Sequence, residues 1–435
     1  MTSNRRDFLK QAALFAMSAA PAITGLSAIT TRAWAAANAG SDFNFVLFRV
    51  IGGMDSLLSI HPWTEDTSKF AEEDLWLTYH RTEVARNIDG TQISLGPSAA
   101  AIAPFAKNMA VVRGVYMGAS DLGHPAAIQH ISSARTQESA AHLAALFGEK
   151  MSDSTRFVVT NTSIQRGNVP PFPVILTQAL KEMGDVADFS TTSSLELYQN
   201  KSLAVNRYLD LLAQKPKLIK FAEVLRERQR TVPPADGVLD ENIALASLAA
   251  GLSRVAQIDL IDQARDLDTH GGHGNHREFQ RVRWDRIAGF LKGLRENGLM
   301  EKTLVAVVTE FNRSPGKNGA AGKDHNYTDN AVALFGRGLE GGRVIGDHKL
   351  YLRSEQNPVS LWAGSFLDYK TGKVSELDAL QAIVAKQNSA KFRLPDHVDL
   401  IRPTDVWATV AQSLAPPVIK SLAPESRIIP GLFRA

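Results

Sequence analysis

The histidines of this sequence gather in one short segment. Three of the eleven, His270, His273 and His276, lie within LDTHGGHGNHREF (267–279), and Asp268 comes two residues before the first. Imidazole with carboxylate suits Zn or Mn, whereas Mg and Ca prefer shells of oxygen. A glycine-rich loop with solvated histidines is the alternative. The density favours Asp268 and His270 as metal ligands with His273 as a further candidate, and places His276 at the start of a helix.

Two further segments carry polar residues beside glycine. In GGMDSLL, Asp55 follows two glycines that permit a tight turn close to a ligand, although Asp55 also suits a helix cap. In MGASDLGHP, Ser120 is a candidate nucleophile, because a metal can lower the pKa of a serine hydroxyl. The alternative for this segment is a Ser-Asp helix cap, and a role for His124 stays open.

A fourth polar segment, VVTEFNRSPGKNGAAGKDHN, combines an acid, an arginine and a histidine. Glu310 ends an apolar run, and Arg313 could clamp an anionic oxygen with two hydrogen bonds. His325 follows in the same segment as a candidate ligand. The alternative is a surface loop, and Lys317 and Lys323 are expected to be solvated.

The hydrophobic pattern predicts the strands and helices that carry these residues. Continuous apolar runs predict buried strands, and apolar residues at helical spacing predict helices between them. Such alternation implies an α/β fold with a mostly parallel sheet, whose strand carboxyl ends would collect all four polar segments on one rim. A capping box of Asn275 and Glu278 is expected to start one helix. The strands are expected in 43–53, 108–118, 302–311 and 330–336, with weaker candidates at 156–160 and 172–176, and the helices at 195–230, 239–265, 276–297, 376–388 and 403–414.

The first residues resemble an export signal. Arg5 and Arg6 precede an apolar run and the small-residue site AWA before Ala36, the order of a bacterial twin-arginine signal. The alternative is a membrane anchor, but proline, glycine and hydroxyl residues make the run only weakly hydrophobic. We predict a signal peptide over 1–35, the twin-arginine translocase as a partner, a periplasmic or secreted protein, and no stable membrane anchor after cleavage.

Charge and cysteine content exclude several classes of function. The whole chain has a formal net charge of +3, and the predicted signal holds four basic residues and one acid, so the remainder is about neutral. No basic surface is left to argue for nucleic acid. The sequence has no cysteine, which rules out disulfides, thiolate metal sites and a cysteine nucleophile. Hydrophobic residues make up 44%, enough for a large globular core.

The motifs together resemble a known family. The chain resembles an exported bacterial family of unknown function in the alkaline phosphatase–sulfatase superfamily, through LDTH, LVAVVTEFNRSPGKNG, GKDH, ALFGRGLEGGRVIGDH and the opening GGMDSL. The likeness runs over about residues 42–350. MGASDLGH is also similar to the nucleophile segment of cofactor-independent phosphoglycerate mutases. The resemblance implies an alkaline-phosphatase-like three-layer α/β sandwich over 42–435, with a helical insertion at 190–260.

The resemblance also implies roles for the site residues. Ser120 would attack the substrate, and Arg313 would bind its anion. The metal ligands implied are Asp55, Asp268, His270, His273, Glu310 and His325.

The departures from the family pattern concern the metals. Glu310-Phe311 stands where the superfamily has Asp-His, so one imidazole is missing, and Asn312 replaces a glycine. No sulfatase signature of Cys or Ser followed by Pro-x-Arg is present. One or two divalent ions are therefore expected.

The sequence thus favours one function over a second. The first is a metal-dependent hydrolase of phosphate or related anionic esters, acting on a small molecule or polymer. The second is a non-catalytic exported protein of the same fold that binds a glycan, an envelope polymer or a partner protein.

Overall fold

The computed structural model describes most of the chain between Phe43 and Arg434. The predicted signal, Ser120 and Lys317 lie outside the described residues, as does nearly all of the predicted helix 376–388. The described ranges are 43–62, 82–118, 123–132, 158–160, 171–172, 215–231, 238–316, 318, 320–351, 361–376, 395–414 and 425–434.

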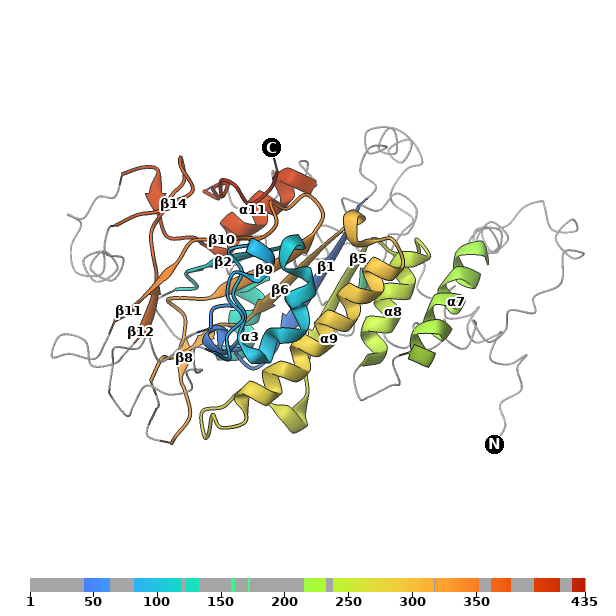
Figure 1. The fold of residues 1–435 in the computed structure, drawn as a ribbon, viewed down its shortest axis with the longest axis horizontal. Helices are drawn as coiled ribbons and strands as arrows, with labels where there is room; N and C mark the ends of the chain where they lie inside the picture. The colour runs from blue at the N-terminus through green and yellow to red at the C-terminus, as the bar shows by residue number, and fades with distance from the viewer. Residues whose placement is uncertain are drawn as a thin grey trace, which may run out of the picture.

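Across these residues, the central sheet has eight strands in the order β10-β2-β9-β6-β1-β5-β3-β4 (Figure 1). Neighbours run parallel except at β9, which is antiparallel to β2 and β6. The predicted α/β fold with a mostly parallel sheet is confirmed. The strands are β1 (Asn44–Val50), β2 (Met109–Arg113), β3 (Val158–Thr160), β4 (Pro171–Phe172), β5 (Val255–Leu260), β6 (Thr303–Thr309), β9 (Ala331–Gly336) and β10 (Arg343–Ile345).

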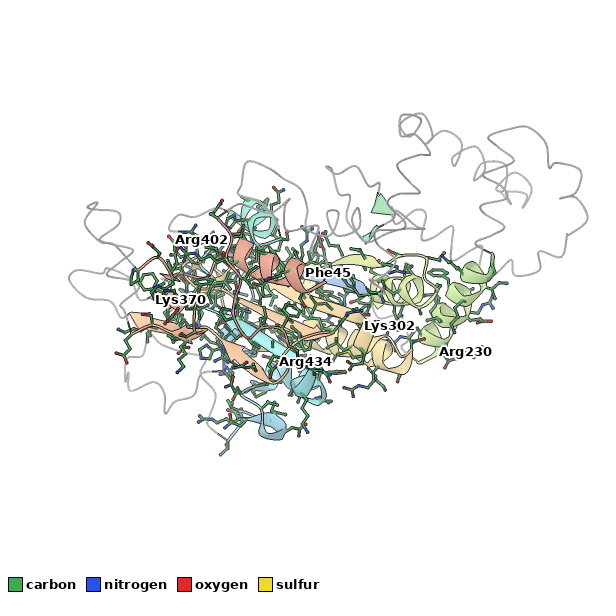
Figure 2. The ribbon with its side chains drawn as sticks, turned by 90° about the horizontal axis from the view of Figure 1, so that it is seen from above. Phe45, Arg230, Lys302, Lys370, Arg402 and Arg434 are labelled. Atoms are coloured by element: carbon green, nitrogen blue, oxygen red, sulfur yellow. The ribbon has the colours of Figure 1, made fainter. Side chains whose placement is uncertain are left out.

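Helices cover both faces of this sheet and make three layers (Figures 1 and 2). On β1, Phe45 and Leu47 join the core under α3 and α11, while Val46 and Phe48 join the core under η3, α7, α8 and α9. The continuous apolar run of this strand therefore reflects burial on both sides. The helices are η1 (Ser56–Leu58), η2 (Ile88–Gly90), η3 (Pro97–Asn108), α3 (Gly123–Ile131), α7 (Lys215–Thr231), α8 (Val238–Ala249), η5 (Gln263–Arg265), α9 (His276–Glu296), η6 (Met300–Lys302) and α11 (Pro403–Leu414).

The prediction for residues 239–265 was wrong in its second half. Within this range α8 and the short η5 are helical, and β5 lies between them as a strand beside β1, so the expected insertion at 190–260 includes part of the central sheet. Two polar residues disguise this strand in the sequence. One of them, Asp259, lies opposite Arg49 on β1, and the guanidinium donates two hydrogen bonds to its buried carboxylate.

Helix α9 begins at His276, as predicted, but without the predicted capping box. Asn275 has helical backbone angles and its side chain caps nothing, while Glu278 pairs with Arg281. The helix is instead held by its apolar face, which buries Trp284 and other residues against the sheet.

Small sheets flank the central one. They are β7 (Asn312–Arg313) with β8 (His325–Asn326), β11 (His348–Tyr351) with β12 (Leu361–Gly364), and β13 (Leu367–Asp368) with β14 (Lys373–Val374) and β15 (Val398–Asp399). Among the helices of the described ranges, none has the length and apolar character needed to cross a membrane.

Candidate metal centre

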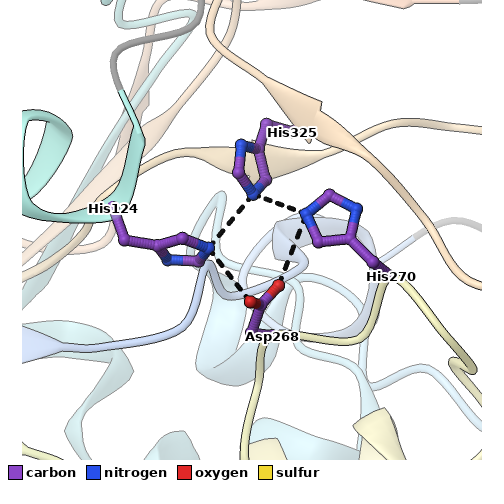
Figure 3. Close-up of side chains that lie close together, drawn as sticks. All are labelled: His124, Asp268, His270 and His325. Atoms are coloured by element: carbon purple, nitrogen blue, oxygen red, sulfur yellow. Dashed lines mark hydrogen bonds and ion pairs between the residues drawn. The ribbon is translucent and has the colours of Figure 1, made fainter.

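Four side chains from three parts of the chain point at one another beyond the strand carboxyl ends (Figure 3). His124 lies in the first turn of α3, and His325 begins β8. Asp268 and His270 come from the loop that follows β5 and η5. We call these four residues the metal centre. The prediction that polar segments distant in sequence meet at one rim is confirmed: three segments supply these four residues, and the fourth, with Asp55, contacts two of them through His273 and Lys323.

The spacing of the four groups fits one tetrahedral ion. His325 Nε2 lies 2.7 Å from His270 Nε2 and 3.1 Å from His124 Nε2. The carboxylate oxygens of Asp268 lie 3.3 Å from His124 Nε2 and 3.4 Å from His270 Nε2. A tetrahedral Zn with ligands at about 2.0–2.1 Å holds neighbouring ligand atoms about 3.3 Å apart. Four of the six pairs of residues thus lie near this spacing, and ligand atoms of all four residues lie within 4.8 Å of one another.

Hydrogen bonds on the far side of each ring orient the imidazoles. His124 Nδ1 lies 3.2 Å from Glu310 Oε2, and His270 Nδ1 lies 3.0 Å from Asp324 Oδ1. Both partners are carboxylates that only accept, so each neutral ring carries its proton on Nδ1 and turns the Nε2 lone pair to the centre. The third ring, His325, contacts Tyr327 Oη through Nδ1 at 2.7 Å. Outer partners of this kind are typical of metal-binding histidines.

The local charge favours a cation at the centre. A hydrogen bond to Glu310 raises the pKa of His124 despite partial burial, so a proton is the natural competitor of a metal there. Burial raises the pKa of Asp268, but the hydrogen bond from Arg313 and the nearby histidines outweigh it, and the pKa is lowered overall. Asp268 therefore stays ionised and available as a ligand.

Glu310 lies behind the metal centre, at the far side of His124, and its predicted role as a ligand stays a prediction. Its side chain is fully buried, and Oε2 accepts from His124 Nδ1 and from the backbone N–H of Gly52 at 2.8 Å. The strand-end position was predicted correctly, but the carboxylate reaches the back of an imidazole.

We expect Glu310→Ala to weaken Zn binding by about 10–100-fold, as removal of such outer partners does elsewhere. Glu310→Gln is the matched control, because its amide oxygen can still accept from His124 while the charge is gone, so its loss should be smaller. Competition with a chelating dye measures both affinities. Equal affinity in the alanine variant and the wild type would contradict this role.

Arg313 binds the protein's own backbone, and its predicted role as an anion clamp stays a prediction. The guanidinium is buried and donates to the carbonyl oxygens of Gly53 at 3.0 Å, Lys323 at 2.9 Å and Leu267 at 2.9 Å, and to that of Gly52. It also reaches Asp268 Oδ1 at 3.1 Å. Arg313 thus ties three loops together and fixes one ligand of the metal centre.

Asp55 pairs with Lys323, which corrects the expectation that this lysine is solvated, while the predicted role of Asp55 as a metal ligand stays a prediction. Lys323 Nζ lies 2.7 Å from Asp55 Oδ2, and both side chains are 2% exposed or less. Burial raises the pKa of Asp55, but the Lys323 ammonium and a hydrogen bond from His273 hold it well below its usual range. The ammonium supplies the positive charge that a metal would bring.

A directed chain of hydrogen bonds continues from this pair and accounts for His273 and His276. The backbone N–H of Asp55 donates to His276 Nε2 at 3.2 Å, so Nδ1 carries the proton and donates to Thr269 Oγ1 at 3.1 Å. The hydroxyl then donates to His273 Nδ1 at 2.6 Å, and His273 Nε2 donates to Asp55 Oδ2 at 3.1 Å. His273 is held in this chain of hydrogen bonds, apart from the four residues of the metal centre, and its role as a ligand stays a prediction. We call Asp55, Thr269, His273, His276 and Lys323 the inner cluster.

Both imidazoles of the inner cluster are neutral in this arrangement. Burial lowers the pKa of His273 to about 4, more than the hydrogen bond to Asp55 raises it. Burial likewise lowers the pKa of His276 well below its usual value. The charges of the cluster are thus one carboxylate and one ammonium, which balance.

Part of the chain matches the model of a family whose function is not assigned. The family model described as "Protein of unknown function (DUF1501)" matches residues 173–361, and no curated protein matches the chain. Among solved structures, the chain is similar to the lipoteichoic acid synthase LtaP from Listeria monocytogenes, with 9% identity, a TM-score of 0.32, and coverage of 71% of this chain and 69% of that one.

Two other solved structures show a likeness of the same order. The alkaline phosphatase from the Antarctic bacterium TAB5 has 11% identity and a TM-score of 0.32, covering 70% of this chain and 94% of that one. The C-terminal periplasmic domain of EcEptC from Escherichia coli, in complex with Zn, has 9% identity and a TM-score of 0.26, covering 68% and 73%. At such scores, function has to be argued from the side chains of the site.

Proposed function

We propose that the protein is an exported hydrolase that binds one Zn or Mn ion at the metal centre and cleaves phosphate or related anionic esters. One observation carries the proposal: three imidazole nitrogens and a carboxylate converge at ligand distances, each ring oriented by a partner on its far side. A metal held there would act as a Lewis acid toward an ester oxygen.

Solvent access supports a catalytic use of this centre. The side chains of Asp268 and His270 are 37% and 41% exposed, whereas the inner cluster behind them is buried. A substrate can therefore approach from the side of the loop after β5. Ser120 stays the proposed nucleophile, and it precedes His124 by four residues, a short span of chain from one ligand.

Export and partners belong to the same proposal. The twin-arginine segment over 1–35 would direct the protein to the periplasm through the translocase, with the metal loaded before or after export. The substrate would be an anionic small molecule or polymer. The metal centre, with Asp268 and Glu310 beside three histidines, suits a cation better than it suits an anion alone, so we expect substrate binding to require the metal.

A binding protein without catalysis is the second candidate, and two observations favour it. Four protein ligands would complete a tetrahedral shell, the pattern of structural Zn sites, whereas catalytic sites keep a position open. Arg313, the residue predicted to hold the substrate anion, is committed to backbone oxygens.

Hydrolysis of a phosphomonoester, a phosphodiester and a sulfate ester separates the two candidates. We expect turnover of at least one ester by protein loaded with Zn or Mn, loss of turnover after chelation, and a large drop in Ser120→Ala with the metal still bound. Bound metal without any turnover would favour the binding protein. Turnover that survives Ser120→Ala would assign the attack to water.

A further inference from the structure

Two histidines and an aspartate meet at a second place in the structure. His61 follows η1, while Asp347 and His348 lie between β10 and the start of β11. One ligand atom from each of the three lies within 4.8 Å of the other two. None of the four residues of the metal centre takes part, and Asp347 and His348 end the segment ALFGRGLEGGRVIGDH, which resembles the family described above.

His348 presents an unpaired lone pair to this cluster. Its side chain is 2% exposed, and Nδ1 donates to Asp329 Oδ2 at 2.7 Å. The proton is thus on Nδ1, and Nε2 is a buried acceptor without a hydrogen-bond partner among the described residues. His61 Nδ1 is buried and unpartnered within the same residues. A buried polar atom left without a hydrogen bond is costly, so two such atoms at one place point to a ligand.

The position of His348 is fixed from several sides. Asn312 Nδ2 donates to Asp329 Oδ2 at 2.9 Å and so holds the carboxylate that orients the ring. The rings of His61 and His348 stack with centroids 4.0 Å apart, and Trp362 covers the other face of His348 at 4.3 Å. A histidine backed by a held carboxylate is a common feature of metal sites.

The charges around the cluster also favour a cation. The guanidinium of Arg113 faces the cluster with a positive charge, which the carboxylates of Asp347 and Asp329 partly offset. Burial, followed by His348 and Arg113, lowers the pKa of His61 well below its usual value. His61 is thus neutral, the form in which imidazole binds metals.

We propose that His61, Asp347 and His348 bind a second divalent transition-metal ion, with water completing its shell. Two imidazoles with one carboxylate suit Zn or a neighbouring first-row metal better than Mg or Ca. Binding would draw the three ligand atoms from within 4.8 Å to about 3.3 Å of one another by rotation of exposed Asp347 and half-buried His61. The ion would join the segment after β1 to β11.

Zn titration of a variant that lacks the metal centre tests this proposal alone. In full-length His270→Ala/His325→Ala, we expect one equivalent of Zn to remain in equilibrium dialysis. Adding His61→Ala should weaken that binding by more than about 100-fold, because even outer partners contribute about 10–100-fold. Asp347→Asn is the second test in the same background, since this exposed residue can change without disturbing the core.

The outcomes are distinct from those for the metal centre. Zn should raise the unfolding temperature of the double variant and leave it unchanged once Asp347→Asn is added. Absence of bound Zn in a folded double variant would overturn the proposal, as would binding that persists in both triple variants. Neither outcome bears on ester hydrolysis, which is assayed with the metal centre intact.

Discussion

Lys323→Met should lower the free energy of unfolding by about 3–5 kcal/mol at neutral pH, because it leaves Asp55 as a buried carboxylate without its cation. Lys323 Nζ and Asp55 Oδ2 are 2.7 Å apart, and neither side chain meets solvent appreciably. The neutral imidazoles of the inner cluster cannot replace the missing charge. Urea unfolding followed by circular dichroism measures the difference.

The pH dependence of this loss has a definite sign. In the wild type the pKa of Asp55 is depressed, so the ion pair stabilises the protein above the carboxyl's unfolded pKa and less as the pH falls through that range. Without Lys323, burial would dominate and raise the pKa of Asp55. A raised pKa contributes stability that is lost as the pH rises, so the deficit of Lys323→Met should shrink from pH 8 toward pH 5.

Asp55→Asn/Lys323→Met is the matched control. It removes both charges and keeps side chains of similar size, and buried pairs replaced together cost little. We expect the double variant to recover most of the stability that the single variant loses. A single variant as stable as the wild type, or a double variant as unstable as the single one, would contradict the assignment of Lys323 as the fixed internal cation.

His325→Ala should produce the largest change in metal binding. His325 Nε2 lies next to the Nε2 atoms of both His270 and His124. Its loss should weaken Zn binding there by more than about 100-fold, beyond the effect of outer partners. Ester hydrolysis should fall with it. Metal competition and turnover are measured on the same samples.

His397→Ala is a matched control, since this histidine lies just before β15, outside both metal-ligating clusters. It should leave Zn affinity and turnover unchanged. Full metal affinity in a folded His325→Ala would contradict the proposed coordination. Full affinity with lost turnover would give His325 a catalytic role without ligation.

The strands and the rim could be read from the sequence because burial on both faces leaves continuous apolar runs. β1, β6 and β9 follow from such runs. β5 was missed because its buried Asp259 pairs with Arg49 on another strand, and a pairing partner 210 residues away leaves no local pattern. Tertiary contacts, unlike periodicity, are invisible in one sequence.

Part of the metal centre could be predicted because several of its residues lie close together in the sequence. Asp268, His270 and His325 are dense local signals, whereas His124 could not be ranked above Ser120 beside it. Lys323 looked like an ordinary loop lysine, since only the fold buries it against Asp55. Residues close together in the sequence could thus be read as one site, whereas a partner supplied by a distant residue, such as Lys323 for Asp55, left no local signal.

Zn titration of the full-length His61→Ala/Asp347→Asn variant is the sharpest test of the metal centre, because this variant lacks the second proposed metal site. After a chelator has removed all metal, we expect this variant to bind one equivalent of added Zn tightly. Adding His325→Ala should lower that Zn affinity by more than about 100-fold. A folded protein that takes up no Zn, or takes it up equally without His325, would contradict the metal centre and the hydrolase proposed from it.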